Sequence, residues 1–155
     1  MSRKSIIKVG DMDINSNTLG NNQLEAFRIE PTFATPTVVM DADNGVFRIE
    51  GNSYPEDPLP VYVPVIEWFK KYAEHPLPST IFEFKFVYFS TASTQLIFEL
   101  FRMLEEIYKN KYEVLVRWYY SADNDEIHEN GLDFSTLFDM PFEVIEVPAE
   151  YPDED

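Results

Sequence analysis

The sequence contains no cysteine and only two histidines among its 155 residues. Without cysteine there is no disulfide framework, no thiol nucleophile and no thiolate metal site, which favours a cytoplasmic location. The chain also lacks any apolar run near the roughly 18–20 residues needed to span a bilayer. Its N-terminus has an apolar stretch of only two residues, Ile6-Ile7, and a serine at position 2. We therefore expect neither a signal peptide nor myristoylation.

Positive charge is scarce. The chain has 12 basic and 28 acidic residues, which gives a formal net charge of −16. Such a field repels nucleic-acid phosphates and anionic lipid surfaces, because binding to either normally depends on basic patches. We expect no nucleic acid and no membrane among its partners. The acidity is compatible with protein partners, and equally with a charge that serves only solubility.

Motifs of the common enzyme and cofactor classes are missing. The sequence has no HExxH, GxSxG, GxGxxG or P-loop, so metal-dependent hydrolysis, serine catalysis and nucleotide binding lack support. Two acidic runs, Asp41–Gly45 and Asp123–Glu126, miss positions that a calcium loop requires, and we interpret them as a turn and a helix start. We expect no cofactor and no metal. An acidic hydrolase or ligand-binding domain using carboxylates near Glu56 and Asp123–Glu129 remains as an alternative.

Apolar and aromatic residues are abundant, at 45% and 15% of the chain, so the sequence is that of a folded domain. Residues 1–22 are polar and lack periodicity, and we expect a flexible N-terminal extension there. Residues 148–155 form an acidic C-terminal tail in the same interpretation. Residues 23–147 are left as one domain, which suits a chain of this length.

Alternating and helical patterns follow one another along this domain. We expect strands over 23–30, 37–41, 46–51, 80–89, 112–120 and 142–147, and helices over 58–74, 92–109 and 123–138. Asp43-Asn44-Gly45 predicts a tight turn and hence an N-terminal hairpin. Pro64 is expected to distort the first helix, and Gly131 to weaken the last. The order predicts an α/β domain with a mixed sheet of about five strands and helices packed against it.

Four hydroxyl residues, Ser90, Thr91, Ser93 and Thr94, lie where an apolar strand meets the best helix of the chain. The first turn of a helix presents backbone N–H groups without an internal acceptor, together with the positive end of the helix dipole. A hydroxyl at Ser90 or Thr91 can therefore simply cap the helix. It can also be a phosphorylation site, because negative charge is well tolerated there. Residue types alone leave both interpretations open.

A second segment, Gly51–Asp57, precedes the first helix. Ser53 or Asp57 is suited to cap that helix, and the prolines suit the turn. These roles do not account for Tyr54, a large aromatic residue in a short loop. An exposed tyrosine at this position favours a protein interface.

Three motifs occur in order: Gly51–Glu56 before an aromatic helix, Tyr88–Ser93 before a leucine-rich helix, and Val116–Tyr120 before an acidic run. With them, the chain resembles the SiaC-like regulatory phosphoproteins of bacteria over roughly residues 35–147. The resemblance implies a STAS-like α/β fold of the anti-sigma-factor-antagonist type. The family's Asn-Thr-Ser-Ser segment aligns with Ser90-Thr91-Ala92-Ser93, so two of its four positions differ here.

The resemblance implies a non-enzymatic switch protein in partner-switching signal transduction. Thr91 is then the phosphoacceptor, with Ser93 as the second candidate. The implied partners are a serine/threonine kinase of the histidine-kinase-like ATPase type, a PPM-type phosphatase, and an effector such as a diguanylate cyclase, which links the switch to c-di-GMP and biofilm regulation. We expect partner contacts at Tyr54, Glu56, Ser90, Ser93 and Thr94. An interaction module without phosphorylation is a further alternative.

Overall fold

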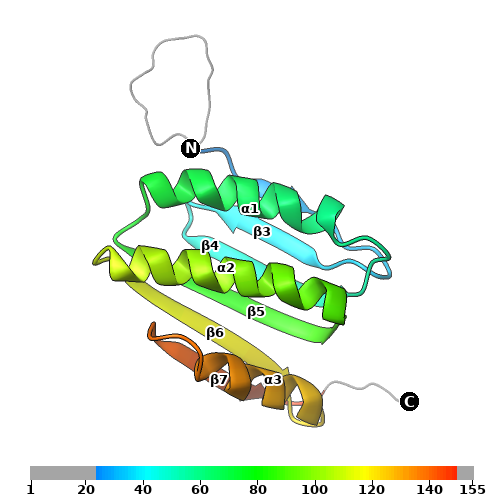
Figure 1. Cartoon of the computed structure of the whole chain (residues 1–155). Coiled ribbons are helices and arrows are strands. Elements are labelled where there is room, and N and C mark those ends of the chain that lie inside the picture. Colours follow the sequence, from blue (N-terminus) through cyan, green and yellow to red (C-terminus); the bar gives the residue numbers. More distant parts are fainter. Residues whose placement is uncertain (1–23, 150–155) are drawn as a thin grey trace.

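The computed structural model describes residues 24–149, and in this part of the chain six strands form one sheet in the order β2-β3-β4-β5-β6-β7. The strands are β2 (Phe27–Ile29), β3 (Thr37–Asp41), β4 (Val46–Ser53), β5 (Ser79–Phe89), β6 (Glu113–Ser121) and β7 (Phe142–Val147). The helices are α1 (Leu59–Glu74), α2 (Thr91–Lys109) and α3 (Asp125–Ser135), and all three lie on the same face of the sheet (Figure 1). No helix within residues 24–149 is long and apolar enough to cross a bilayer.

The sheet is mixed, as expected. β3 pairs antiparallel with both β2 and β4, whereas β4, β5, β6 and β7 pair in parallel. The hairpin between β3 and β4 turns at Gly45, whose φ of 67° is in the region that favours glycine. The Asn44 N–H donates to the Asp41 carboxylate at 3.2 Å and stabilises the same turn. The α/β fold with an N-terminal hairpin is confirmed, with six strands. The expected extension 1–22 and residues 150–155 of the tail lie outside the described residues.

Two elements are shorter than their sequence patterns predict. The strand expected over 23–30 is limited to β2, and α3 occupies 125–135 in place of 123–138. Asn124, which lies within the acidic run that we interpreted as a helix start, caps α3, because its Oδ1 accepts from the Ile127 N–H at 3.2 Å. Beyond the helix, the Glu105 carboxylate accepts from two successive N–H groups of the following loop, at 3.0 and 3.1 Å. This contact with α2 draws the chain away from a helical path.

Pro64 does not interrupt its helix, and Gly131 has a packing role that the sequence did not predict. α1 runs through Pro64 without interruption, because the carbonyl of Pro60 that loses its donor belongs to an exposed turn and can bind water. Gly131 is required where it lies: a Cβ built on it would be 2.3 Å from Cδ1 of the Trp118 ring. Glycine at this position lowers the helix propensity of α3, but it lets the helix pack closely on the sheet.

Alternate residues of the strands point toward the helices and form the core. Phe82, Phe84 and Phe86 of β5 are buried, and Trp118 of β6 packs against Phe84 with ring centroids 5.9 Å apart. The Trp118 indole N–H donates to the Ile127 carbonyl of α3 at 2.9 Å. The aromatic strand 80–89 is central in the sheet, as expected.

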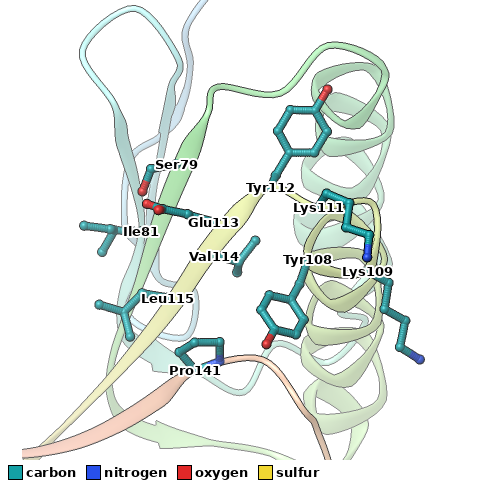
Figure 2. A pocket seen from close by; sticks show the side chains of 10 residues that line it. All are labelled: Ser79, Ile81, Tyr108, Lys109, Lys111, Tyr112, Glu113, Val114, Leu115 and Pro141. Carbon is teal, nitrogen blue, oxygen red and sulfur yellow. The ribbon is translucent and has the colours of Figure 1, made fainter.

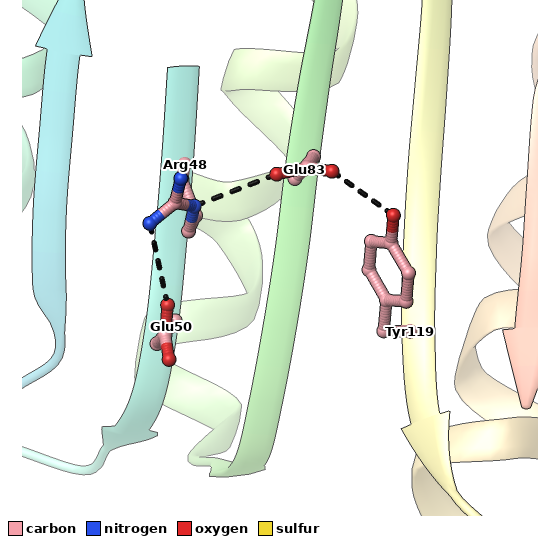
Figure 3. A network of polar contacts seen from close by, with 4 residues as sticks. All are labelled: Arg48, Glu50, Glu83 and Tyr119. Atoms are coloured by element: carbon pink, nitrogen blue, oxygen red, sulfur yellow. Dashed lines mark hydrogen bonds and ion pairs between the residues drawn. The ribbon is translucent and has the colours of Figure 1, made fainter. Parts of the chain in front are cut away.

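The opposite face of the sheet carries a network of polar contacts that spans β4, β5 and β6, with charged side chains on β4 and β5 and Tyr119 on β6 (Figure 3). Arg48 forms ion pairs with Glu83 at 3.4 Å and with Glu50 at 3.8 Å. The Tyr119 hydroxyl donates to the other oxygen of Glu83 at 2.9 Å. Partial burial, together with the hydrogen bond and charge of Glu83, raises the pKa of Tyr119. Cross-strand pairing of this kind keeps the uncovered face polar.

Candidate functional site

The joint between β5 and α2 is built by Ser90. This residue is extended, with φ −80° and ψ 163°, and its Oγ accepts from the Ser93 N–H at 3.2 Å as an N-cap. Its own N–H donates to the Ser53 carbonyl at 2.8 Å, which ties the start of α2 to the end of β4. Ser90 is thus the helix cap that the residue pattern allowed, and Thr91 is the first residue of the helix.

Three of the four hydroxyls at this joint have structural partners. Ser90 caps the helix, and the Thr94 hydroxyl donates to the Ser90 carbonyl at 3.1 Å. Ser93 is fully buried and donates to the Ser53 carbonyl at 3.2 Å. Thr91 differs from them: it is exposed, and its hydroxyl has no hydrogen-bond partner among the described residues. A reagent that approaches this turn from solvent meets the Thr91 hydroxyl.

Beneath the turn lies a buried hydroxyl network. The Oγ atoms of Ser53 and Ser93 share a hydrogen bond at 2.9 Å, and Ser53 Oγ shares another with the Tyr62 hydroxyl of α1 at 2.7 Å. Burial raises the pKa of Tyr62 to about 12, and the hydrogen bonds from the two serines only partly offset this effect. The network joins β4, α1 and α2 at one point, so the first turn of α2 is held firmly against the sheet.

An aromatic row lies beside the turn. The pairing of β4 with β5 shifts register after Gly51: Gly51 opposes Phe86 and Asn52 opposes Tyr88, so Val87 is skipped. This bulge turns Tyr88 outward, where its ring meets Tyr54 edge-on at 5.9 Å between centroids. The Tyr54 ring in turn meets Phe33 edge-on at 6.0 Å. We call Phe33, Tyr54 and Tyr88 the aromatic ridge.

The site carries no positive charge of its own. The segments that build it, 29–36, 51–66 and 86–101, contain no lysine, arginine or histidine. They do contain Glu56 and Asp57, both exposed in the loop after β4. Asp57 accepts from the Leu59 N–H at 3.1 Å, whereas Ser53, the other expected cap of α1, belongs to the buried network. The surface near Thr91 is therefore apolar and acidic.

Most of the expected contact residues lie together at this end of the sheet. The sequence favoured an interface if Tyr54 were exposed, and the structure shows this residue half-buried, with its ring against those of Phe33 and Tyr88. Ser93 is fully buried, so in this conformation it is neither a contact residue nor an accessible hydroxyl. Sequence reasoning missed Phe33, Tyr62 and Tyr88. A signal for Phe33 was present, since it is a lone aromatic residue between prolines 31 and 36.

Hollows elsewhere on the surface do not gather the carboxylates that the hydrolase alternative names. One beside α2 is lined by Glu99, Glu105 and Glu106, together with the basic residues Arg102 and Lys109. A second lies at the amino ends of β5 and β6, where Tyr108, Lys109, Lys111 and Tyr112 surround it and Glu113 is its single acidic residue (Figure 2). Another lies at the carboxyl ends of β4 to β7, with Glu50, Lys85 and Asp123 in its lining. None of these hollows brings Glu56 together with the 123–129 run, as the hydrolase alternative requires. Among residues 24–149, no group of three His, Asp or Glu side chains is placed to hold a metal ion.

Comparison with known proteins agrees with this architecture. The model of a family described as SiaC family regulatory phosphoprotein matches residues 29–147. An uncharacterised protein of Pseudomonas aeruginosa strain UCBPP-PA14 is 25% identical over 116 residues, which cover 75% of this chain and 92% of that protein. The crystal structure of apo-SiaC from P. aeruginosa is similar with a TM-score of 0.71 at 24% identity, covering 77% of this chain and 98% of that one.

A further similar chain comes from the crystal structure of the P. aeruginosa diguanylate cyclase SiaD in complex with its activator SiaC. Its TM-score is 0.73 at 24% identity, with 78% of this chain and 99% of that one covered. These structural likenesses establish the common fold, and the family model matches most of the sequence. The chain therefore belongs to the SiaC family of regulatory phosphoproteins.

Proposed function

We propose that this chain is a non-enzymatic switch whose phosphorylation on Thr91 controls binding to an effector protein. One observation carries the proposal: of the four hydroxyls at the start of α2, Thr91 alone is exposed and without a hydrogen-bond partner. The family supplies the class, since its members are regulatory phosphoproteins. We take residues 23–147 as the regulatory domain.

The chemistry on Thr91 is supplied by partner enzymes. A serine/threonine kinase of the histidine-kinase-like ATPase type transfers the γ-phosphoryl group of ATP to Thr91 Oγ, and ADP and the hydroxyl proton leave. A PPM-type phosphatase hydrolyses the ester and returns threonine and inorganic phosphate. The first-turn N–H groups of α2 and the helix dipole favour the added charge of roughly −1.5 to −2, so the domain stays folded in both states.

The effector is of the diguanylate cyclase class, because in P. aeruginosa a SiaC protein is the activator of SiaD. No basic residue in the segments around Thr91 can pair with the phosphate. The phosphate is therefore left on the surface, beside the aromatic ridge. A protein docked over the ridge would have to desolvate this dianion, which is costly. We expect the unphosphorylated form to bind the effector.

The test is incubation with ATP and a serine/threonine kinase of the histidine-kinase-like ATPase type from the same genome, followed by mass spectrometry of the modified residue. We expect a single phosphate on Thr91 and none in Thr91→Ala. Thr136→Ala is the matched control, because Thr136 is also an exposed threonine at a helix end but lies beyond α3. Phosphate that persists in Thr91→Ala and disappears in another hydroxyl variant would contradict the assignment.

A further inference from the structure

The aromatic ridge exposes large apolar side chains to solvent. Phe33 is 87% exposed and Tyr88 is 44% exposed. Leu59 and Val63 in the first turns of α1, and Val87 near the end of β5, are exposed too. The Tyr54 ring is in contact with both Phe33 and Tyr88, and exposed apolar residues that gather in this way mark interaction sites, whereas scattered ones do not.

Phe33 is held in place although its side chain is in solvent. The loop between β2 and β3 closes on itself through Thr32 and Thr35, whose hydroxyls share a hydrogen bond at 2.6 Å and whose backbones share another at 3.1 Å. The Tyr54 N–H donates to the Ala34 carbonyl at 2.8 Å and ties this loop to the end of β4. An aromatic side chain presented on a rigid loop loses little entropy on binding, which is the property of an interface anchor.

The charge around the ridge indicates what covers it. The segments 29–36, 51–66 and 86–101 hold no lysine, arginine or histidine, and Glu56 and Asp57 lie exposed in the loop that follows Tyr54. A second copy of the chain would bring the same acidic loop and a further formal charge of −16. An anionic lipid surface would be repelled in the same way. A protein segment that carries apolar side chains flanked by lysine or arginine would complement the ridge in both polarity and charge.

We infer that the aromatic ridge is the anchor of the effector contact and that its occupant is a basic, apolar protein segment, such as an amphipathic helix. This inference rests on the proposed function in placing the effector beside Thr91. It adds Phe33 and Tyr88 to the contact surface and specifies the chemistry of the partner.

The probe is a peptide of leucine and lysine, about 18 residues long, with leucines three and four positions apart so that they share one helix face. It is titrated into the full chain, with the dissociation constant measured by calorimetry and the contact mapped by amide NMR shifts. One control peptide has glutamate for each lysine, and a second has serine for each leucine. We expect the largest shifts in the loops that carry Phe33 and Tyr54, and weaker binding of both control peptides.

Phe33→Ser is expected to weaken binding of the Leu/Lys peptide by about tenfold or more, because it removes a full aromatic contact. Leu137→Ser is the matched control: Leu137 is 60% exposed but follows α3, at the amino end of the parallel strands. We expect it to change the affinity by less than about twofold. Neither residue belongs to the core, so both variants should fold.

Equal affinity of wild type and Phe33→Ser, or shifts confined to the charged face of the sheet, would overturn the inference. A dimer that Phe33→Ser abolishes would also overturn it, because the occupant would then be a second copy. These measurements need no phosphorylation. The peptide titration can therefore refute the role of the ridge without refuting phosphorylation of Thr91, and the kinase assay can do the reverse.

Discussion

A pair of glutamate substitutions tests the contrast between Thr91 and Ser93. Thr91→Glu adds a carboxylate to an exposed first-turn position, where the helix dipole favours negative charge by about 0.3–1 kcal/mol. Ser93→Glu places the same carboxylate at a fully buried position. An unpaired buried charge costs several kcal/mol, on the order of 3–5. We expect Thr91→Glu to leave stability unchanged or slightly raised, and Ser93→Glu to remove a large part of it.

The control for lost hydrogen bonds is Ser93→Ala, which should cost only about 1 kcal/mol. In that variant Ser53 Oγ keeps the Tyr62 hydroxyl at 2.7 Å, and the Ser53 carbonyl keeps the Ser90 N–H at 2.8 Å. Any loss in Ser93→Glu beyond this value therefore reports burial of the larger, charged side chain, and the part of it that depends on pH reports the charge.

Urea unfolding followed by circular dichroism measures all three variants. The pH dependence gives a second check, because burial raises the pKa of the introduced carboxyl group above its ordinary value of about 4.3. A raised pKa in the folded state means that folding favours the protonated carboxyl group. The loss of unfolding free energy in Ser93→Glu should therefore shrink as the pH falls toward 4. If Ser93→Glu proved as stable as Thr91→Glu, the burial argument would fail and Ser93 would again be an accessible candidate for phosphorylation.

Two other predictions concern the packing that holds the site. Gly131→Ala should destabilise the fold by about 1–3 kcal/mol, because its Cβ would meet the buried Trp118 ring at 2.3 Å and this overpacking outweighs a propensity gain of up to about 1 kcal/mol. Glu129→Ala on the exposed side of the same helix is the control, and greater stability of Gly131→Ala in urea unfolding would refute the packing argument. Tyr62 should make the free energy of unfolding fall as the pH rises from about 10 to about 12, by up to about 3 kcal/mol, because its raised pKa disfavours the ionised form in the folded state. The drop should be smaller in Tyr62→Phe, and an identical drop in wild type and variant would show that Tyr62 does not carry it.

Local patterns in the sequence were enough to predict most elements. The turn Asp43-Asn44-Gly45, the alternation of β5 and the apolar stripe of α2 each predicted a structure that is present. These signals are local, because a turn needs a positive φ at one residue and a half-buried strand or helix needs apolar residues at its own period. The hydroxyl cluster likewise marked the start of α2 as the place of interest, through the motifs shared with the family.

The sequence was a poor guide where contacts with residues distant in the chain outweigh local preference. The end of α3 depends on the Glu105 carboxylate of α2, and Gly131 depends on the Trp118 ring of β6. The sequence around these residues does not predict either contact. Propensity is worth at most about 1 kcal/mol at such a position, so a steric clash or a set of hydrogen bonds overrides it.

The sequence by itself determined the α/β class, the hairpin, the absence of basic residues around the hydroxyl cluster and the four candidate hydroxyls. Only the tertiary structure decided what each hydroxyl does. The parallel pairing of β4 with β5 brings Ser53 beneath α2, where it buries Ser93 and leaves Thr91 in solvent. Packing, too, assembles Phe33 and Tyr54 from two loops and Tyr88 from β5 into one surface. Burial and such a surface are properties of residues far apart in the chain, so no local pattern encodes them.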